Sequence, residues 1–228
     1  MRYASVLKNH EGKPCNAAIT ARITPQIFHA KEIKYHFLPL YYSLGNRKKE
    51  YPSMSEKQRK YEFTWDVIGS DLALARPSLG GNTSIEVYRL FQFTMRDVIE
   101  QNYGTEVADT LFRHAGVLAG KAFYDKFCTE ATDVNTLVKR VQDLFKDLGI
   151  GIFRVESFNP ETMEAMFTVD EDLDCSGLPD IDDQICVYDE GFIAGILLGF
   201  TGKTFEVKEV DCWCTGARTC RFSAKPTE

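Results

Sequence analysis

The chain has 228 residues, 44% of them hydrophobic, which is enough for one core of roughly 150 residues plus a smaller part. Its 27 basic and 33 acidic residues give a net charge of −6, which argues against a surface built to bind nucleic acid. No secretory signal is visible, and the most apolar run, residues 191–200, is about half a membrane span. We therefore expect a cytoplasmic protein with no direct nucleic-acid or membrane partner. Seven cysteines in that compartment indicate metal ligands or buried thiols rather than disulfides.

The first sixty residues lack a sustained hydrophobic period. They contain Pro25, Pro39 and Pro52 and a basic stretch over residues 46–60. We predict a poorly patterned N-terminal extension over residues 1–60 and a folded domain over residues 61–228. Translation from Met54 is one explanation of this division, and an extension that packs on the domain is the other.

The first patterned segments are a strand and a helix. Residues 61–68 alternate between polar and apolar side chains, which predicts a strand. Residues 84–102 have a helical period, and Thr83 and Glu86 stand at the spacing of a capping box. The apolar residues of this helix fall on one side: Val87, Leu90, Phe91, Val98 and Ile99.

Two more helices follow, over residues 105–127 and 134–148. Asp133 is suited to cap the second of them, and Gly149 ends it. The first carries a stripe of small residues flanked by rings: Phe112, Ala115, Gly116, Ala119, Gly120 and Phe123.

The C-terminal half predicts two hairpins with a helix between them. The helix covers residues 185–200. The strands cover residues 150–158, 162–170, 204–213 and 219–223. Helices, hairpin, helix and hairpin in this order predict an α+β fold, with an antiparallel sheet packed against helices.

Glycines repeat every four residues along the last predicted helix. Gly191, Gly195 and Gly199 clear one helix face, so another backbone or a ligand can approach it closely. Residues that could line an apolar ligand pocket near these glycine faces are Phe91, Met95, Phe112, His114, Gly116, Phe123, Phe153, Phe167, Tyr188, Phe192 and Gly195. The alternative is that these rings fill the core and that His114 is an ordinary helix residue.

A possible metal site lies at the closing hairpin. Cys212 and Cys220 are symmetric about Gly216, so they face each other across the strands. Glu209 is on the same hairpin, but it needs a bulge or twist to reach the same side as Cys212. Cys186 begins the preceding helix, so a metal would tie that helix to the hairpin.

Three thiolates and a carboxylate suit a closed structural zinc site. The spacing alone is a weak signal, and from the residues alone buried free cysteines are the better interpretation. Cys175 and Cys214 are rival ligands. We interpret them, with Cys15 and Cys128, as structural or incidental.

The motifs at residues 186–195, 209–212 and 216–222 resemble the 4-vinyl reductase-type domain family, and residues 116–120 fit its earlier half. The resemblance covers residues 61–224. That family includes aromatic-sensing domains of phenol-responsive bacterial activators. The resemblance implies a zinc ion held by Cys186, Glu209, Cys212 and Cys220, and an apolar ligand. The histidine and tryptophan that contact phenol in those sensors have no counterpart here that we can place, and this chain lacks their ATPase and DNA-binding domains.

Three functions follow from the resemblance. The first is a sensory module that binds a hydrophobic or aromatic small molecule and acts through a downstream signalling partner. The second is a homodimeric scaffold of the same fold. The third is an accessory or catalytic component of a vinyl-group reductase. The sequence offers no convincing set of nucleophile and base and no intact dinucleotide or phosphate loop, so we predict no catalytic residues.

Overall fold

The computed structural model describes residues 61–69 and 71–227, so the predicted extension over residues 1–60 lies outside the described part. The described elements are η1 (Trp65–Ile68), α1 (Leu72–Ala75), α2 (Ile85–Tyr103), α3 (Thr105–Phe127), α4 (Val134–Asp147), β1 (Ile152–Phe158), β2 (Ala165–Asp170), α5 (Val187–Thr201), β3 (Phe205–Asp211), η2 (Trp213–Thr215) and β4 (Cys220–Pro226). None of the described helices has the length and apolar content to cross a membrane.

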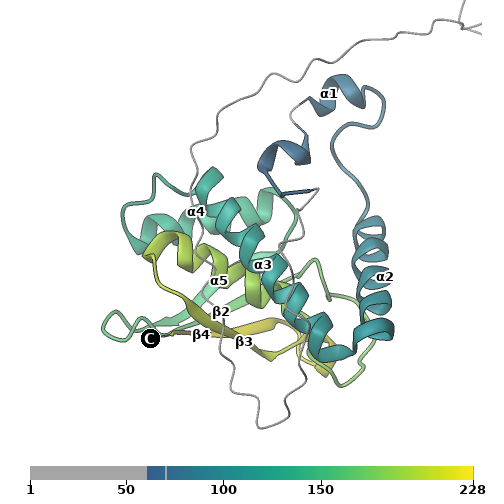
Figure 1. Ribbon diagram of the computed structural model, residues 1–228. Helices are drawn as coiled ribbons and strands as arrows, with labels where there is room; N and C mark the ends of the chain where they lie inside the picture. The colour runs from purple at the N-terminus through teal and green to yellow at the C-terminus, as the bar shows by residue number, and fades with distance from the viewer. Residues whose placement is uncertain (1–60, 70, 228) are drawn as a thin grey trace, which may run out of the picture. The chain divides into compact units, whose positions relative to one another are not determined.

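The four strands form one sheet in the order β1-β2-β4-β3, and every neighbouring pair is antiparallel. Helices α3, α4 and α5 lie on one face of this sheet (Figure 1). The predicted α+β fold with an antiparallel sheet is therefore confirmed. Strand β4 is central, and its residues Phe222 and Ala224 are fully buried beneath the helices.

Most element predictions hold to within a few residues. Asp133 caps α4 as expected, because its side chain accepts a hydrogen bond from the Thr136 amide at 3.0 Å. The predicted strand over residues 61–68 is wrong. Its second half is the short 3-10 helix η1, whose Trp65 ring packs edge-on against Phe127 at 5.0 Å. This segment pairs with no strand in the described chain, so its alternation reflects one anchored ring in an exposed segment.

The glycine faces of α3 and α5 pack directly on each other. A Cβ atom added to Gly120 would overlap the carbonyl oxygen of Phe192, and one added to Gly195 would overlap that of Val117. Gly116 and Gly191 are in the same situation. Of the two explanations for the glycine spacing, the structure supports close helix packing, because the other helix's backbone occupies the space.

Aromatic rings fill the layer between helices and sheet. Phe123 of α3 contacts Phe192 of α5, with ring centroids 5.3 Å apart. Phe153 of β1 lies 5.3 Å from Phe145 on one side and 5.3 Å from Phe167 on the other. This continuous cluster joins both helix layers to the sheet, as expected for a packed core.

Helix α2 presents its polar side to the rest of the domain. Arg89 donates to the carbonyl oxygens of Leu173 and Ser176, and Gln92 donates to Asp174. The apolar residues that the sequence places on one side of this helix point outward instead, and Phe91 is 66% exposed. Hydrogen bonds to the loop after β2, rather than apolar burial, therefore hold α2 in place.

Candidate metal centre

Four buried cysteines from separate segments come together at one end of the sheet. Cys175 lies in the loop after β2, Cys186 precedes α5, Cys212 follows β3, and Cys220 begins β4. Their sulfur atoms all lie within 4.8 Å of one another, and each residue is at most 1% exposed. A group of this kind could hold a metal ion.

The sulfur distances are those of a compact, unbonded cluster. The Sγ atom of Cys186 lies 3.8 Å from that of Cys212 and 3.9 Å from that of Cys220. Cys175 and Cys220 are 3.0 Å apart, which is too long for a disulfide bond of about 2.05 Å. All four are free thiols.

Local features of the closing hairpin place two of these thiols. The register of β3 against β4 shifts between Glu209 and Asp211, so the bulge expected between Glu209 and Cys212 is present. The chain then turns through η2, and Gly216 has a φ of 85°, a conformation that favours glycine. This turn brings Cys212 and Cys220 into the same cluster.

Glu209, the carboxylate of the predicted ligand set, lies beside the cluster. It is 4% exposed, and its Oε2 atom accepts a hydrogen bond from the Cys186 amide at 3.1 Å. Its Oε1 atom is buried without a hydrogen-bond partner among the described residues. Burial, followed by the neighbouring Cys212, raises the pKa of Glu209 to about 9.

The predicted ligands Cys186, Cys212 and Cys220 thus converge, and the fourth residue of the compact group is Cys175. Cys175 was ranked as a rival ligand because no short spacing links it to the hairpin. Its place depends on β2 pairing with β4, in the register that sets Val169 opposite Cys220. Cys214 and Cys128 are buried outside the group of four, and Cys15 lies outside the described residues.

The four thiols polarise one another. Hydrogen bonds from Cys175, Cys186 and Cys220 lower the pKa of Cys212 strongly. Hydrogen bonds with the other three thiols raise the pKa of Cys186. Such a cluster favours at least one thiolate, which is the form that binds a metal.

Several buried carboxylates surround the cysteines, and two of them have full sets of partners. Asp174 accepts hydrogen bonds from Tyr88 at 2.8 Å and from Gln92 at 2.7 Å. Glu190 accepts from the Arg113 guanidinium at 2.6 Å and from the Glu209 amide at 3.0 Å. These contacts tie α2, α3 and β3 to the region around the cluster.

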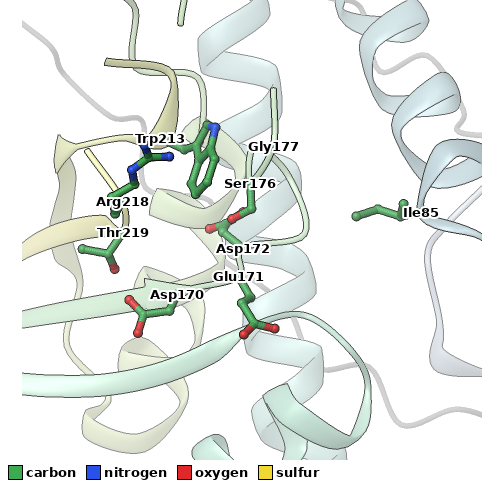
Figure 2. A pocket seen from close by; sticks show the side chains of 9 residues that line it. All are labelled: Ile85, Asp170, Glu171, Asp172, Ser176, Gly177, Trp213, Arg218 and Thr219. Atoms are coloured by element: carbon green, nitrogen blue, oxygen red, sulfur yellow. The ribbon is translucent and has the colours of Figure 1, made fainter. Parts of the chain in front are cut away.

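A depression of about 670 Å³ lies next to the cysteine cluster. Trp213, which directly follows Cys212, forms part of its wall, and the Arg218 guanidinium lies 5.2 Å from the Trp213 ring. Figure 2 shows Trp213, Arg218 and Thr219 on one side of the depression and Ile85 of α2 on the opposite side. The other lining residues are Asp170, Glu171, Asp172, Ser176 and Gly177. An indole, a guanidinium and several carboxylates give this surface both apolar and polar contacts.

The residues predicted to line a ligand pocket lie in three different places. Those in the buried aromatic layer are Phe123, Phe153, Phe167 and Phe192, with the half-buried Tyr188 stacked on Phe192. Gly116 and Gly195 are in the contact between α3 and α5. Phe91 and Met95 are exposed on α2, His114 is exposed on α3, and Phe112 is half-buried beneath the Arg96 guanidinium.

Comparison with known proteins gives a consistent family. An uncharacterized protein of Methanocaldococcus jannaschii is 22% identical over 147 residues, which cover 64% of this chain and 80% of that protein. A solved vinyl-4-reductase family protein from the same organism is 17% identical, with a TM-score of 0.47 and coverage of 64% of this chain and 83% of the other.

Two further solved structures are similar. The phenol-responsive sensory domain of the transcription activator PoxR is 17% identical, has a TM-score of 0.47, and covers 58% of this chain and 71% of its own. A trafficking protein particle complex subunit 3 from Naegleria fowleri is 16% identical, has a TM-score of 0.49, and covers 63% and 95%. Residues 166–226, which contain all four clustered cysteines, match the family model of the vinyl-4-reductase (V-4-R) domain, so the resemblance to the 4-vinyl reductase-type family is confirmed there.

Proposed function

We propose that this protein is a sensory or binding module for an aromatic or otherwise hydrophobic small molecule, and that a zinc ion bound by Cys175, Cys186, Cys212 and Cys220 stabilises it. The observation that carries the metal part is the convergence of four buried thiols within 4.8 Å. The match to the vinyl-4-reductase domain over the same residues supports the binding part. A cytoplasmic location, where thiols stay reduced, fits this proposal.

The cysteine group fits zinc in its donors and its spacing. Zinc bonds of about 2.3 Å to sulfur in a tetrahedron place sulfur atoms about 3.8 Å apart. The distances from Cys186 to Cys212 and to Cys220, 3.8 and 3.9 Å, agree with that value. The Cys175–Cys220 distance of 3.0 Å would need to open as the ion enters.

In this proposal Cys175 is the fourth ligand in place of Glu209. Glu209 instead accepts the Cys186 amide hydrogen bond and so orients the start of α5 toward the cluster. A closed shell of four thiolates leaves no position for a substrate, so the ion would act structurally. It would hold together four chain segments that meet beside the depression.

The depression is the candidate ligand site. Its wall includes the Trp213 ring, which suits an aromatic molecule, and Arg218, which suits a polar or anionic substituent on that molecule. Because Trp213 directly follows Cys212, the metal centre would fix the position of this wall. A ligand bound here would also lie near Ile85, at the start of α2. Movement of α2 is one route by which binding could reach a signalling partner.

Thermal melts with phenol as the aromatic probe and palmitate as the fatty probe test this site. A probe that binds the folded state at 100 times its Kd stabilises it by about 2.7 kcal/mol, so the melting temperature should rise. Arg218→Ala, at an exposed position, should remove the rise, and Lys225→Ala should keep it. A rise that survives Arg218→Ala would move the ligand to the apolar interior predicted from the sequence. If neither probe raises the melting temperature of the wild type, the binding function loses its support.

A homodimeric scaffold is the second candidate, because α2 carries an outward apolar face. Val87, Leu90, Phe91 and Val98 are all more than half exposed. Their spacing of three, four and seven residues resembles the seam by which two helices pair. A second copy presents the same stripe, so the two faces could pair about a two-fold axis. Light scattering should then show a dimer that Phe91→Asp converts to a monomer, whereas a monomeric wild type would exclude this interface.

A further inference from the structure

A second group of metal-ligating side chains adjoins the cysteine centre. One carboxylate oxygen each from Asp172 and Asp189 and the sulfur of Cys186 lie within 4.8 Å of one another. Asp172 lies in the loop after β2, and Asp189 lies in the first turn of α5. The group therefore bridges the same loop and helix as the cysteine centre, but with mainly oxygen donors.

The carboxylates of this group lack the partners that their neighbours have. Asp172 is 2% exposed, and within the described chain its Oδ1 atom accepts hydrogen bonds only from the Asp174 and Cys175 amides. The Oδ2 atom of Asp189 is buried and has no hydrogen-bond partner among the described residues. Neither carboxylate forms an ion pair with any described residue.

Neighbouring acids show that this lack of partners is specific to the group. Asp174, also 2% exposed and in the same loop, has the Tyr88 hydroxyl and the Gln92 amide as donors. Glu190, the residue after Asp189, has Arg113. A buried carboxylate without such a partner costs several kcal/mol, and a bound cation is one of the few groups that offset this cost.

We propose that Asp172, Cys186 and Asp189 bind a second divalent cation, with the Cys186 thiolate shared between this ion and the ion of the cysteine centre. The proposal rests on the proposed cysteine centre, because Cys186 belongs to both. One sulfur and two carboxylate oxygens suit zinc. Glu209 stands beside Cys186 with a buried, unpartnered Oε1 atom, so a further oxygen donor is at hand.

The two sites differ in what they leave open. Four thiolates close the first shell, whereas three protein donors leave at least one position of the second for water or a ligand oxygen. Asp172 also lines the depression described above, where Figure 2 shows it between Glu171 and Ser176. An oxygen-bearing small molecule in the depression would therefore lie next to a residue of the second site.

Native mass spectrometry of the full-length protein, titrated with zinc and desalted before measurement, tests the proposal. The wild type should retain two zinc ions per chain. Asp189→Asn, which removes the charge and keeps the shape, should retain one. Asp174→Asn, a buried acid of the same loop outside the group, should retain two. If Asp189→Asn does not fold, as judged by circular dichroism, Asp172→Asn replaces it and should also retain one.

The outcomes separate the two metal proposals. A wild type that saturates at one zinc overturns the second site and leaves the cysteine centre standing. A wild type that retains no zinc overturns both. Two ions in the wild type and in both the Asp189→Asn and Asp172→Asn variants would overturn this set of ligands.

Discussion

The sulfur atoms of Cys175 and Cys220 lie 3.0 Å apart although 45 residues separate them along the chain. The pairing of β2 with β4 brings them together, since Val169 stands opposite Cys220 and the loop after β2 then returns over that strand. A metal ion at this point would join the loop, the start of α5 and the closing hairpin. Fold stability and metal binding should therefore be linked.

The first prediction concerns loss of the metal. Cys220→Ser should abolish zinc retention and lower the melting temperature, because metal binding contributes folding free energy. Cys214→Ser changes an equally buried thiol outside the cluster and should retain the metal. Plasma mass spectrometry gives the zinc content, and circular dichroism follows unfolding. Full zinc occupancy in Cys220→Ser would contradict the ligand set.

The second prediction concerns the contact between α3 and α5. Alanine usually stabilises a helix relative to glycine by about 1 kcal/mol. Gly195→Ala should instead destabilise the protein by about 1–3 kcal/mol, because the added methyl group meets the Val117 carbonyl oxygen. Gly81→Ala is the control, since its Cβ atom makes only an ordinary contact of 3.5 Å with Leu72. Urea unfolding measures both, and a stabilised Gly195→Ala would show that the helices do not pack this closely.

The third prediction concerns the attachment of α2. Tyr88→Phe removes the hydroxyl that donates to the buried Asp174 at 2.8 Å. Loss of a partner to a buried polar group costs about 1–3 kcal/mol, so stability should fall by that amount. Hydrogen exchange should also become faster in α2, because the remaining contacts of this helix are few and polar. Tyr103→Phe changes an exposed tyrosine of the same helix, and an equal effect there would refute the role of Asp174.

The fourth prediction concerns the start of α4. Asp133→Ala removes the side chain that accepts from the Thr136 amide and hydroxyl, and loss of such a cap costs about 1 kcal/mol. Asp143→Ala removes only an exposed pair with Lys139 on the same helix and should change stability by less than about 0.5 kcal/mol. Thermal unfolding compares the two variants. Equal effects would mean that the cap contributes nothing beyond a surface charge.

Local patterns in the sequence predicted the parts of the fold that short-range physics determines. The helices, both hairpins and the bulge near Glu209 follow from periodicity, capping residues and turn residues. The glycine spacing also predicted that something approaches α5 closely, but only the structure shows that it is the backbone of α3. A cleared helix face looks the same in sequence whether a helix or a ligand fills it.

Two features lay beyond the reach of the sequence because they depend on pairings between distant segments. Cys175 joins the cluster only through the β2–β4 register, for which no local signal exists. The apolar stripe of α2 was recognised, but its direction was not, because the donors that turn Tyr88, Arg89 and Gln92 inward find their acceptors more than 80 residues later. Hydrophobic periodicity alone predicts that such a stripe faces the core.

Zinc-edge X-ray absorption of the full-length protein tests the central claim most directly. The metal-free protein would receive less than one equivalent of zinc, so that the site of four thiolates fills first. We predict a first shell of four sulfur atoms at about 2.3 Å. A shell of three sulfur atoms and one oxygen that loses its oxygen in Glu209→Gln would contradict the four-cysteine centre and support Glu209 as the fourth ligand. A shell of oxygen and nitrogen alone would contradict any metal site at these cysteines.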